Sequence, residues 1–283
     1  MSSIFSTLCN HLLATLMLAA AATASAPAFA AAPLMQDPPE IQRRVAALAE
    51  GVYPASACSW WGPGDAPAPG PLRIHAGAMT LGSLSQAMFA PGQEVGVGWQ
   101  GGTRPDFNWE VRAPGDRMAS IVRTEEGPTT GFIEIGRAPP GGRNIEEGWQ
   151  CAALDLRAMP LLSPANPLRE LMAELYDTGG REVAGACRNL GRKVNGKRVG
   201  GETRSARYSL SREAVVLNGK TLPLRQAERL DLGSRLDDGA INASFGWPDG
   251  SNFHVEQFAG SPLAVALFSF SEGEARWSCR PGR

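Results

Sequence analysis

Four cysteines have the type and spacing from which chemistry is predicted most directly. A segment Ala-x-Ala-Cys ends at Cys58 and again at Cys187, and a segment Trp-x-Cys ends at Cys151 and again at Cys279. The cysteines of each repeat are therefore 93 (151 − 58) and 92 (279 − 187) positions apart. A fifth cysteine, Cys9, lies in the N-terminal segment 1–30. The four cysteines after this segment indicate two disulfides if the chain is exported, and three connectivities exist for them. The nearly equal spacing predicts the pairs Cys58–Cys151 and Cys187–Cys279.

A metal site is the competing use of these thiols. No two of the cysteines have C-x-x-C spacing, and only His75 and His254 are histidines in the chain after residue 30. We therefore predict neither a metal nor another cofactor.

Catalytic signatures are absent from the sequence, which contains no G-x-S-x-G, H-E-x-x-H, phosphate-binding loop or dinucleotide fingerprint. A serine triad would have to use His75 or His254, and we interpret each as an ordinary strand histidine. Acidic pairs such as Glu146-Glu147 are adjacent, which directs their side chains apart on a strand. No catalytic residue is predicted, although a glycosidase stays open because a fold can bring two distant carboxylates together.

The N-terminal segment indicates export. Residues 1–30 contain no Asp, Glu, Lys or Arg, and residues 12–22 form an apolar run shorter than a bilayer-spanning helix. Ala28-Phe29-Ala30 places small residues where a signal peptidase reads them. We predict a signal peptide over residues 1–30, with an uncleaved anchor as the alternative, and a periplasmic or secreted mature chain without a transmembrane segment. Few lysines among 27 basic residues, with abundant Ala, Gly and Pro, indicate a GC-rich bacterial source.

A local excess of positive charge lies in the second part of the chain. Nine Lys or Arg residues fall between Arg181 and Arg212, against Glu182 and Glu202 alone. This stretch is interpreted as a solvated loop, with a loop that faces an acidic partner as the alternative. Nucleic acid is not expected, because the stretch lacks interleaved aromatic residues. The predicted binding residues are Arg192, Lys193, Lys197 and Arg198.

Two helices and a series of strands are expected to carry these residues. Asp37-Pro38 and Asn166-Pro167 each resemble a helix start, and apolar stripes follow them to about residue 50 and residue 177. Alternation over residues 72–81 predicts one half-buried strand. Asn218-Gly219 predicts a type I′ hairpin, with Pro223 on an edge. Other strands are expected at 94–100, 107–112, 118–124, 131–137, 147–154, 239–247, 252–258, 263–271 and 276–279.

The pattern predicts a mainly β protein of two tandem antiparallel barrel or sandwich units. Each unit is preceded by a short α-helix and closed by a disulfide. The expected boundaries are 37–155 for the first unit, 156–165 for a linker and 166–283 for the second unit.

Two tryptophans that follow glycine are further candidates for a binding surface. Gly98-Trp99, with Arg104 nearby, and Gly246-Trp247 each precede a Gly-rich turn. Trp and Arg are typical of interface hot spots. The alternative is that Trp99 and Trp247 are core residues, since Trp is usually buried.

The second unit resembles the bacterial C-type lysozyme inhibitor family. The similar segments are 213–226 (EAVVLNGKTLPLRQ), 232–236 with Asp238-Gly239, and 245–250 (FGWPDG). Loops of that family carry Ser-Gly-x-x-Tyr and Lys-Gly motifs; here Gly233 is kept, with Leu232 and Leu236 at the Ser and Tyr positions. The resemblance implies an exported, disulfide-tied small β-barrel that inhibits another protein.

These observations favour an exported, non-catalytic binding protein of the bacterial envelope, of the inhibitor, immunity or assembly-factor type. The expected partner is an envelope protein, acidic if the basic stretch contacts it. The alternative is a module that binds or hydrolyses cell-wall glycan.

Overall fold

The structure is a computed structural model that describes residues 38–66, 68–87, 93–101, 106–113, 117–123, 130–137, 146–163, 165–194, 197–234, 240–257, 265 and 267–282. The predicted signal peptide, residues 1–30, lies outside these residues. Residues 32–283 form one compact unit. We call residues 38–155 the first half and residues 166–282 the second half.

One short α-helix precedes the strands of each half, as predicted. Helix α1 spans Pro38–Ala47 and buries Val45 and Ala46. Helix α2 spans Pro167–Leu175, and the side chain of Asn166 caps it by accepting a hydrogen bond of 3.0 Å from the Leu168 N–H. Each helix presents an apolar stripe to the core, which is what fixes it to the sheet.

Strands make up most of the described residues, so the mainly β class is confirmed. The first half contains β1 (Gly51–Tyr53), β2 (Ala55–Trp61), β3 (Leu72–His75), β4 (Ala78–Leu81), β5 (Leu84–Ala87), β6 (Glu94–Gln100), β7 (Asp106–Ala113), β8 (Arg117–Arg123), β9 (Thr130–Arg137) and β10 (Glu147–Asp155). The second half contains β11 (Val183–Asn189), β12 (Arg192–Val194), β13 (Lys197–Val199), β14 (Thr203–Leu210), β15 (Ala214–Leu217), β16 (Lys220–Pro223), β17 (Arg229–Ser234), β18 (Ile241–Gly246), β19 (Asn252–Gln257), β20 (Leu267–Glu272) and β21 (Ala275–Pro281). Short 3-10 helices cover Pro160–Leu162 (η1) and Leu224–Gln226 (η2).

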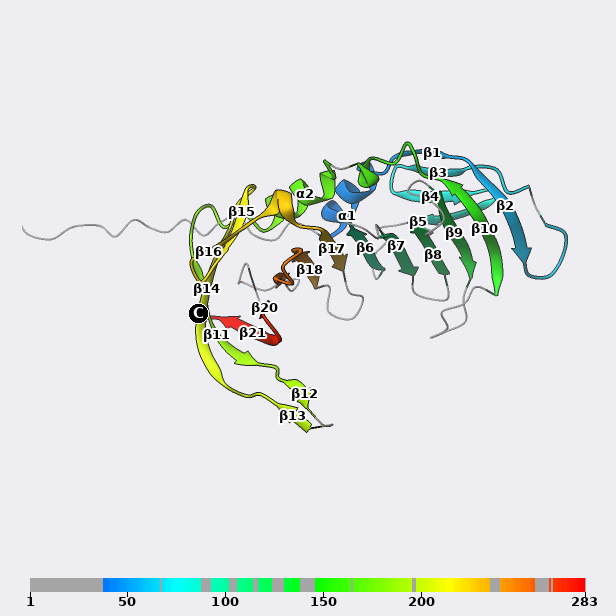
Figure 1. Ribbon diagram of the computed structural model, residues 1–283. Helices are drawn as coiled ribbons and strands as arrows, with labels where there is room; N and C mark the ends of the chain where they lie inside the picture. The colour runs from blue at the N-terminus through cyan, green and yellow to red at the C-terminus, as the bar shows by residue number, and fades with distance from the viewer. Residues whose placement is uncertain are drawn as a thin grey trace, which may run out of the picture. The chain divides into compact units, whose positions relative to one another are not determined.

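The described strands form three antiparallel sheets. A 15-stranded sheet has the order β16-β15-β14-β11-β21-β20-β19-β18-β17-β6-β7-β8-β9-β10-β2. A four-stranded sheet, β1-β3-β4-β5, forms a second layer in the first half, where β5 packs against β8 and β9 (Figure 1). Strands β12 and β13 pair only with each other among the described strands.

Neither half closes into a barrel, which corrects that part of the predicted architecture. Strand β6 of the first half pairs instead with β17 of the second, with Val97 opposite Leu232 and Trp99 opposite Leu230. Without this contact both strands would be open edges with unpaired N–H and C=O groups. Edge pairing between the halves therefore replaces closure within each half. The predicted boundaries at 156–165 stay a prediction.

The predicted strand over residues 72–81 is a hairpin, which is a second correction. Ala76 and Gly77 form a two-residue turn between β3 and β4, with φ angles of 48° and 78°. Alternation continues across this turn, so periodicity alone could not reveal it. The predicted hairpin at Asn218-Gly219 is confirmed, with φ angles of 51° and 84°, and Pro223 lies on β16 at the edge of the large sheet.

Both predicted disulfides are confirmed. Cys58 on β2 is bonded to Cys151 on β10, and Cys187 on β11 is bonded to Cys279 on β21. Each pair also lies directly opposite in its strand register. Each bond therefore joins the first long strand of a half to its last. Because stable disulfides form in oxidising compartments, these bonds indicate a location outside the cytoplasm.

One face of the large sheet carries the core. Cross-strand rows such as Phe107, Trp99, Leu230, Phe245 and Phe253 run through both halves on this face. Most of these side chains are fully buried, and Trp99 is partly buried. Along the described part of the chain, no helix has the length and apolarity that crossing a membrane requires.

Candidate functional site

The four predicted basic residues lie on the paired strands β12 and β13, which we call the basic hairpin (residues 192–199). Register places Lys193 opposite Arg198, and Arg192 opposite Val199. Figure 1 shows the hairpin extending from the ends of β11 and β14. The basic stretch predicted as a loop is therefore largely strand. Asn195-Gly196, a pair typical of hairpin turns, stands between the two strands in the sequence and is the signal that could have revealed them.

Other basic residues of the same stretch have structural partners. The Arg204 guanidinium lies 4.0 Å from the centre of the Trp277 ring and forms an ion pair of 2.7 Å with Glu272. Arg207 and Arg212 form longer ion pairs, with Glu182 and Glu174. The structure thus separates residues that fasten β14 to the fold from the hairpin that extends beyond the large sheet.

Two apolar side chains flank the basic hairpin on the surface. Leu190, just before β12, is 43% exposed, and Val199, at the end of β13, is 58% exposed. Exposed apolar groups beside cationic ones are a composition found at protein interfaces. The base of the hairpin is held tightly, because a Cβ at Gly191 would lie 2.3 Å from the Val199 carbonyl oxygen.

Trp247, predicted as a rim residue with a core alternative, has a buried side chain. It is 7% exposed, and its indole N–H donates a hydrogen bond of 2.9 Å to the Pro223 carbonyl. Its ring centre lies 6.3 Å from that of Phe245. These contacts favour a packing role.

Trp99 lies within β6, partly buried against the core. The Arg169 guanidinium is 5.7 Å from its ring centre, and a Cβ at Gly101 would lie 2.7 Å from the indole. The ring is therefore enclosed on two sides. Arg104, its predicted companion, lies outside the described residues.

These candidates do not form one site. Five strands separate β11, which leads into the basic hairpin, from β6, which carries Trp99. The sequence grouped them by residue type, whereas the sheet order places them on distant strands.

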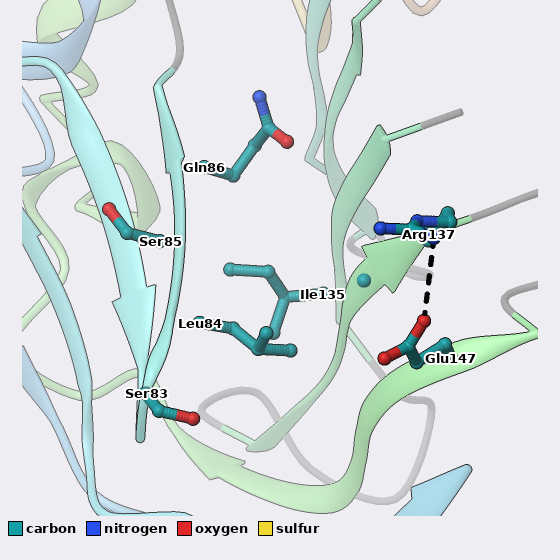
Figure 2. A pocket seen from close by; sticks show the side chains of 8 residues that line it. Ser83, Leu84, Ser85, Gln86, Ile135, Arg137 and Glu147 are labelled. Atoms are coloured by element: carbon teal, nitrogen blue, oxygen red, sulfur yellow. Dashed lines mark ion pairs between the residues drawn. The ribbon is translucent and has the colours of Figure 1, made fainter. Parts of the chain in front are cut away.

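A cleft that the sequence did not reveal lies between the two sheets of the first half (Figure 2). It has a volume of about 320 Å³ and is lined by residues 83–86 and by Ile135, Gly136, Arg137 and Glu147. Figure 2 shows Leu84 and Ile135 between the two layers, with Arg137 and Glu147 on the side of β9 and β10. No local motif joins these segments, so no sequence signal was available to find the cleft.

The charged side of the cleft is held loosely. Arg137 Nη1 lies 3.7 Å from Glu147 Oε2, and the two side chains are 63% and 43% exposed. This separation exceeds the 2.7–2.9 Å typical of a charge-assisted hydrogen bond. The Arg137 guanidinium therefore keeps donors that a ligand can use.

Buried phenols elsewhere belong to the core. Burial raises the pKa of Tyr53 to about 12, and its hydroxyl donates a hydrogen bond of 2.7 Å to the Ala49 carbonyl. Burial also raises the pKa values of Tyr176 and Tyr208. Such shifts disfavour the charged phenolate, which is what burial among apolar side chains causes. Searched over the described ranges, His, Cys, Asp and Glu form no group of three or more that would hold a metal.

Comparison of the chain with protein-family models, with curated proteins and with solved structures found no match. The resemblance of the second half to the C-type lysozyme inhibitor family therefore stays a prediction.

Proposed function

We propose that this chain is an exported, non-catalytic binding protein of the bacterial envelope that recognises an acidic protein partner through the basic hairpin. The observation that supports this most is that four Lys and Arg residues occupy two short strands that pair with each other. Such a protein would act as an inhibitor, an immunity-type protein or an assembly factor.

The charge distribution supports an acidic partner. Residues 183–201 contain Arg188 and the four basic residues of the hairpin but no Asp or Glu, whereas the whole chain has a net charge of −1. A concentrated positive patch on a nearly neutral protein attracts an acidic surface and speeds association at low salt. Leu190 and Val199 flank the hairpin and supply exposed apolar surface, which a partner can bury in addition to forming ion pairs.

The compartment supports an envelope partner. The two disulfides require an oxidising location, and the predicted signal peptide of residues 1–30 would direct the chain to the periplasm or the medium.

Carbodiimide cross-linking in a periplasmic extract tests the proposal, because it couples a lysine amine to a carboxylate in direct contact. The chain has three lysines, of which Lys193 and Lys197 lie on the hairpin and Lys220 lies elsewhere, 2.9 Å from Asp249. We expect one stoichiometric partner, coupled through Lys193 or Lys197 and not through Lys220. Lys220 thus serves as an internal control.

A pair of charge-reversal variants completes the experiment. Lys193→Glu with Arg198→Glu changes two facing hairpin positions, whereas Arg225→Glu with Arg280→Glu changes two exposed positions elsewhere. The hairpin variant should lose the partner and the control should keep it. Retention of the partner by the hairpin variant, or binding only to purified peptidoglycan, would contradict the proposal.

A further inference from the structure

We propose that the cleft of the first half binds a small organic carboxylate that carries a short apolar group. The cleft and the basic hairpin belong to different halves, so this inference is independent of the protein partner.

Apolar side chains from the two sheets of the first half would contact the apolar part of the ligand. Leu84 on β5 and Ile135 on β9 both line the cleft, and Figure 2 shows their side chains between the two strands. Ile135 is 2% exposed, so its side chain belongs to the rigid core. A volume of about 320 Å³ lies at the lower end of ligand sites, which is suited to a small molecule.

The carboxylate is placed by Arg137. Glu147 occupies the register position beside Arg137 on β10, but the 3.7 Å between Arg137 Nη1 and Glu147 Oε2 leaves donors of the guanidinium available to a ligand. A guanidinium presents donors in a planar fork that matches a carboxylate.

Glu147 faces Arg137 and sets the strength of binding. A Cβ at residue 62 would lie 2.9 Å from Glu147 Cγ, so the glycine at this position makes room for the Glu147 side chain. A ligand carboxylate must compete with Glu147 for Arg137. Removing the negative charge of Glu147 should therefore strengthen binding.

Gln86 supplies an oriented polar group within the cleft. Its side chain is 4% exposed, and its Nε2 donates a hydrogen bond of 2.8 Å to the Ala87 carbonyl. That bond fixes the amide plane before a ligand arrives, so little side-chain freedom is lost on binding.

Hexanoate is the probe for an NMR titration of the purified full chain, with hexanamide and hexylammonium as neutral and cationic counterparts. We expect hexanoate to shift the amide signals of residues 83–86 and 135–137. Hexanamide should bind at least about tenfold more weakly, because it loses the charged hydrogen bonds to Arg137. Absence of saturable shifts with hexanoate, or tighter binding of hexylammonium, would overturn the inference.

Three single variants sharpen the test. Arg137→Gln should weaken hexanoate binding about tenfold or more, and Glu147→Gln should strengthen it several-fold. Arg112→Gln is the matched control, because Arg112 forms a similar surface ion pair of 3.2 Å with Glu110 but does not line the cleft. Melting temperatures of all three should stay close to wild type. Equal affinity of Arg137→Gln and Arg112→Gln, or weaker binding by Glu147→Gln, would refute the assigned roles.

Discussion

In the first half, the segment after α1 is interrupted at Pro54, whereas in the second half the corresponding segment is the uninterrupted strand β11. Val183 stands 129 positions (183 − 54) after Pro54 and pairs with Tyr208. Proline has a fixed φ and no N–H to donate, so it favours a break in the pairing. Strand β1 consequently joins β3, while β2 joins β10.

This break gives the two halves different surfaces. In the first half the four-stranded sheet is a separate layer, and the cleft lies between it and the large sheet. In the second half β11 pairs with both β14 and β21, so its longer strands stay in one sheet, and β12 and β13 pair with each other outside it. The same frame of helix and disulfide thus supports a cleft in one half and a projecting hairpin in the other.

The segment between the first disulfide cysteine and the next strand of the sheet has a similar length in the two halves but a different structure. Strand β3 begins 14 positions after Cys58 (72 − 58), and β14 begins 16 positions after Cys187 (203 − 187). In the second half this segment contains the paired strands β12 and β13, whereas the described residues between β2 and β3 form no strand. A surface connection between two strands tolerates such change, so it is a favourable place for a binding element.

The largest expected effect contrasts the two Gly-Trp positions. Trp247→Ala should cost about 3 to 5 kcal/mol of unfolding free energy, because it leaves a cavity and an unpaired Pro223 carbonyl. Trp99→Ala should cost less, because that ring is only partly buried. Urea denaturation of both variants measures the difference. A Trp247→Ala protein as stable as wild type would restore the interpretation of Trp247 as a rim residue.

The next effect compares the disulfides. Replacing Cys58 and Cys151 by alanine, or Cys187 and Cys279, should cost about 2 to 5 kcal/mol in each case, because the closed loops span 93 and 92 positions. The two variants should differ in local order. Loss of the Cys58–Cys151 bond should speed hydrogen exchange at the backbone amides of β2, because among the described strands β2 pairs only with β10. Strand β11 pairs on both sides, so loss of its disulfide should change the exchange of its amides less. Hydrogen exchange tests this, and equal protection of β2 and β11 would contradict it.

A smaller effect concerns the residue before each Trp-x-Cys segment. A Cβ at Gly148 would lie 2.3 Å from the Ile135 carbonyl oxygen, and Gly148→Ala should cost about 1 to 3 kcal/mol. Arg276 is the corresponding residue of the second half (276 − 148 = 128) and is exposed. Arg276→Ala should therefore change stability little. Thermal melts compare the two, and similar losses would show that the halves do not differ here.

The smallest effect is a dependence on pH. The hydrogen bond from Lys220 lowers the pKa of Asp249 from 3.8 to about 2, and the Arg157 hydrogen bond does the same for Asp155. A lowered pKa stabilises the fold above about pH 4, and this contribution is lost as the pH falls through about 2. Both pairs are exposed, so solvent screens them and the change should be slight. In Asp249→Asn and in Asp155→Asn, the melting temperature should fall less between pH 4 and pH 2 than it does in the wild type. An equal fall in variant and wild type would contradict this.

Features that depend on local geometry or on the repeat could be predicted from the amino-acid sequence. Nearly equal cysteine spacing identified both disulfides, alternating residues identified the mainly β class, and Asn218-Gly219 identified its hairpin. Each signal lies within a short segment or in a comparison of one half with the other. Such signals can be recognised without knowing which segments become neighbours in the folded chain.

Which strands pair across the molecule could be seen only in the folded chain. The pairing of β6 with β17 depends on two edges about 130 positions apart, and the alternation of each strand fits many partners equally well. The turn at Ala76 carries no turn residue at its first position, so it was hidden by the alternation around it. The cleft combines Leu84, Ile135 and Arg137 from segments that become neighbours only when the chain breaks at Pro54 and folds β5 over β9. A contact between distant segments is a property of packing, and for that reason no local pattern encodes it.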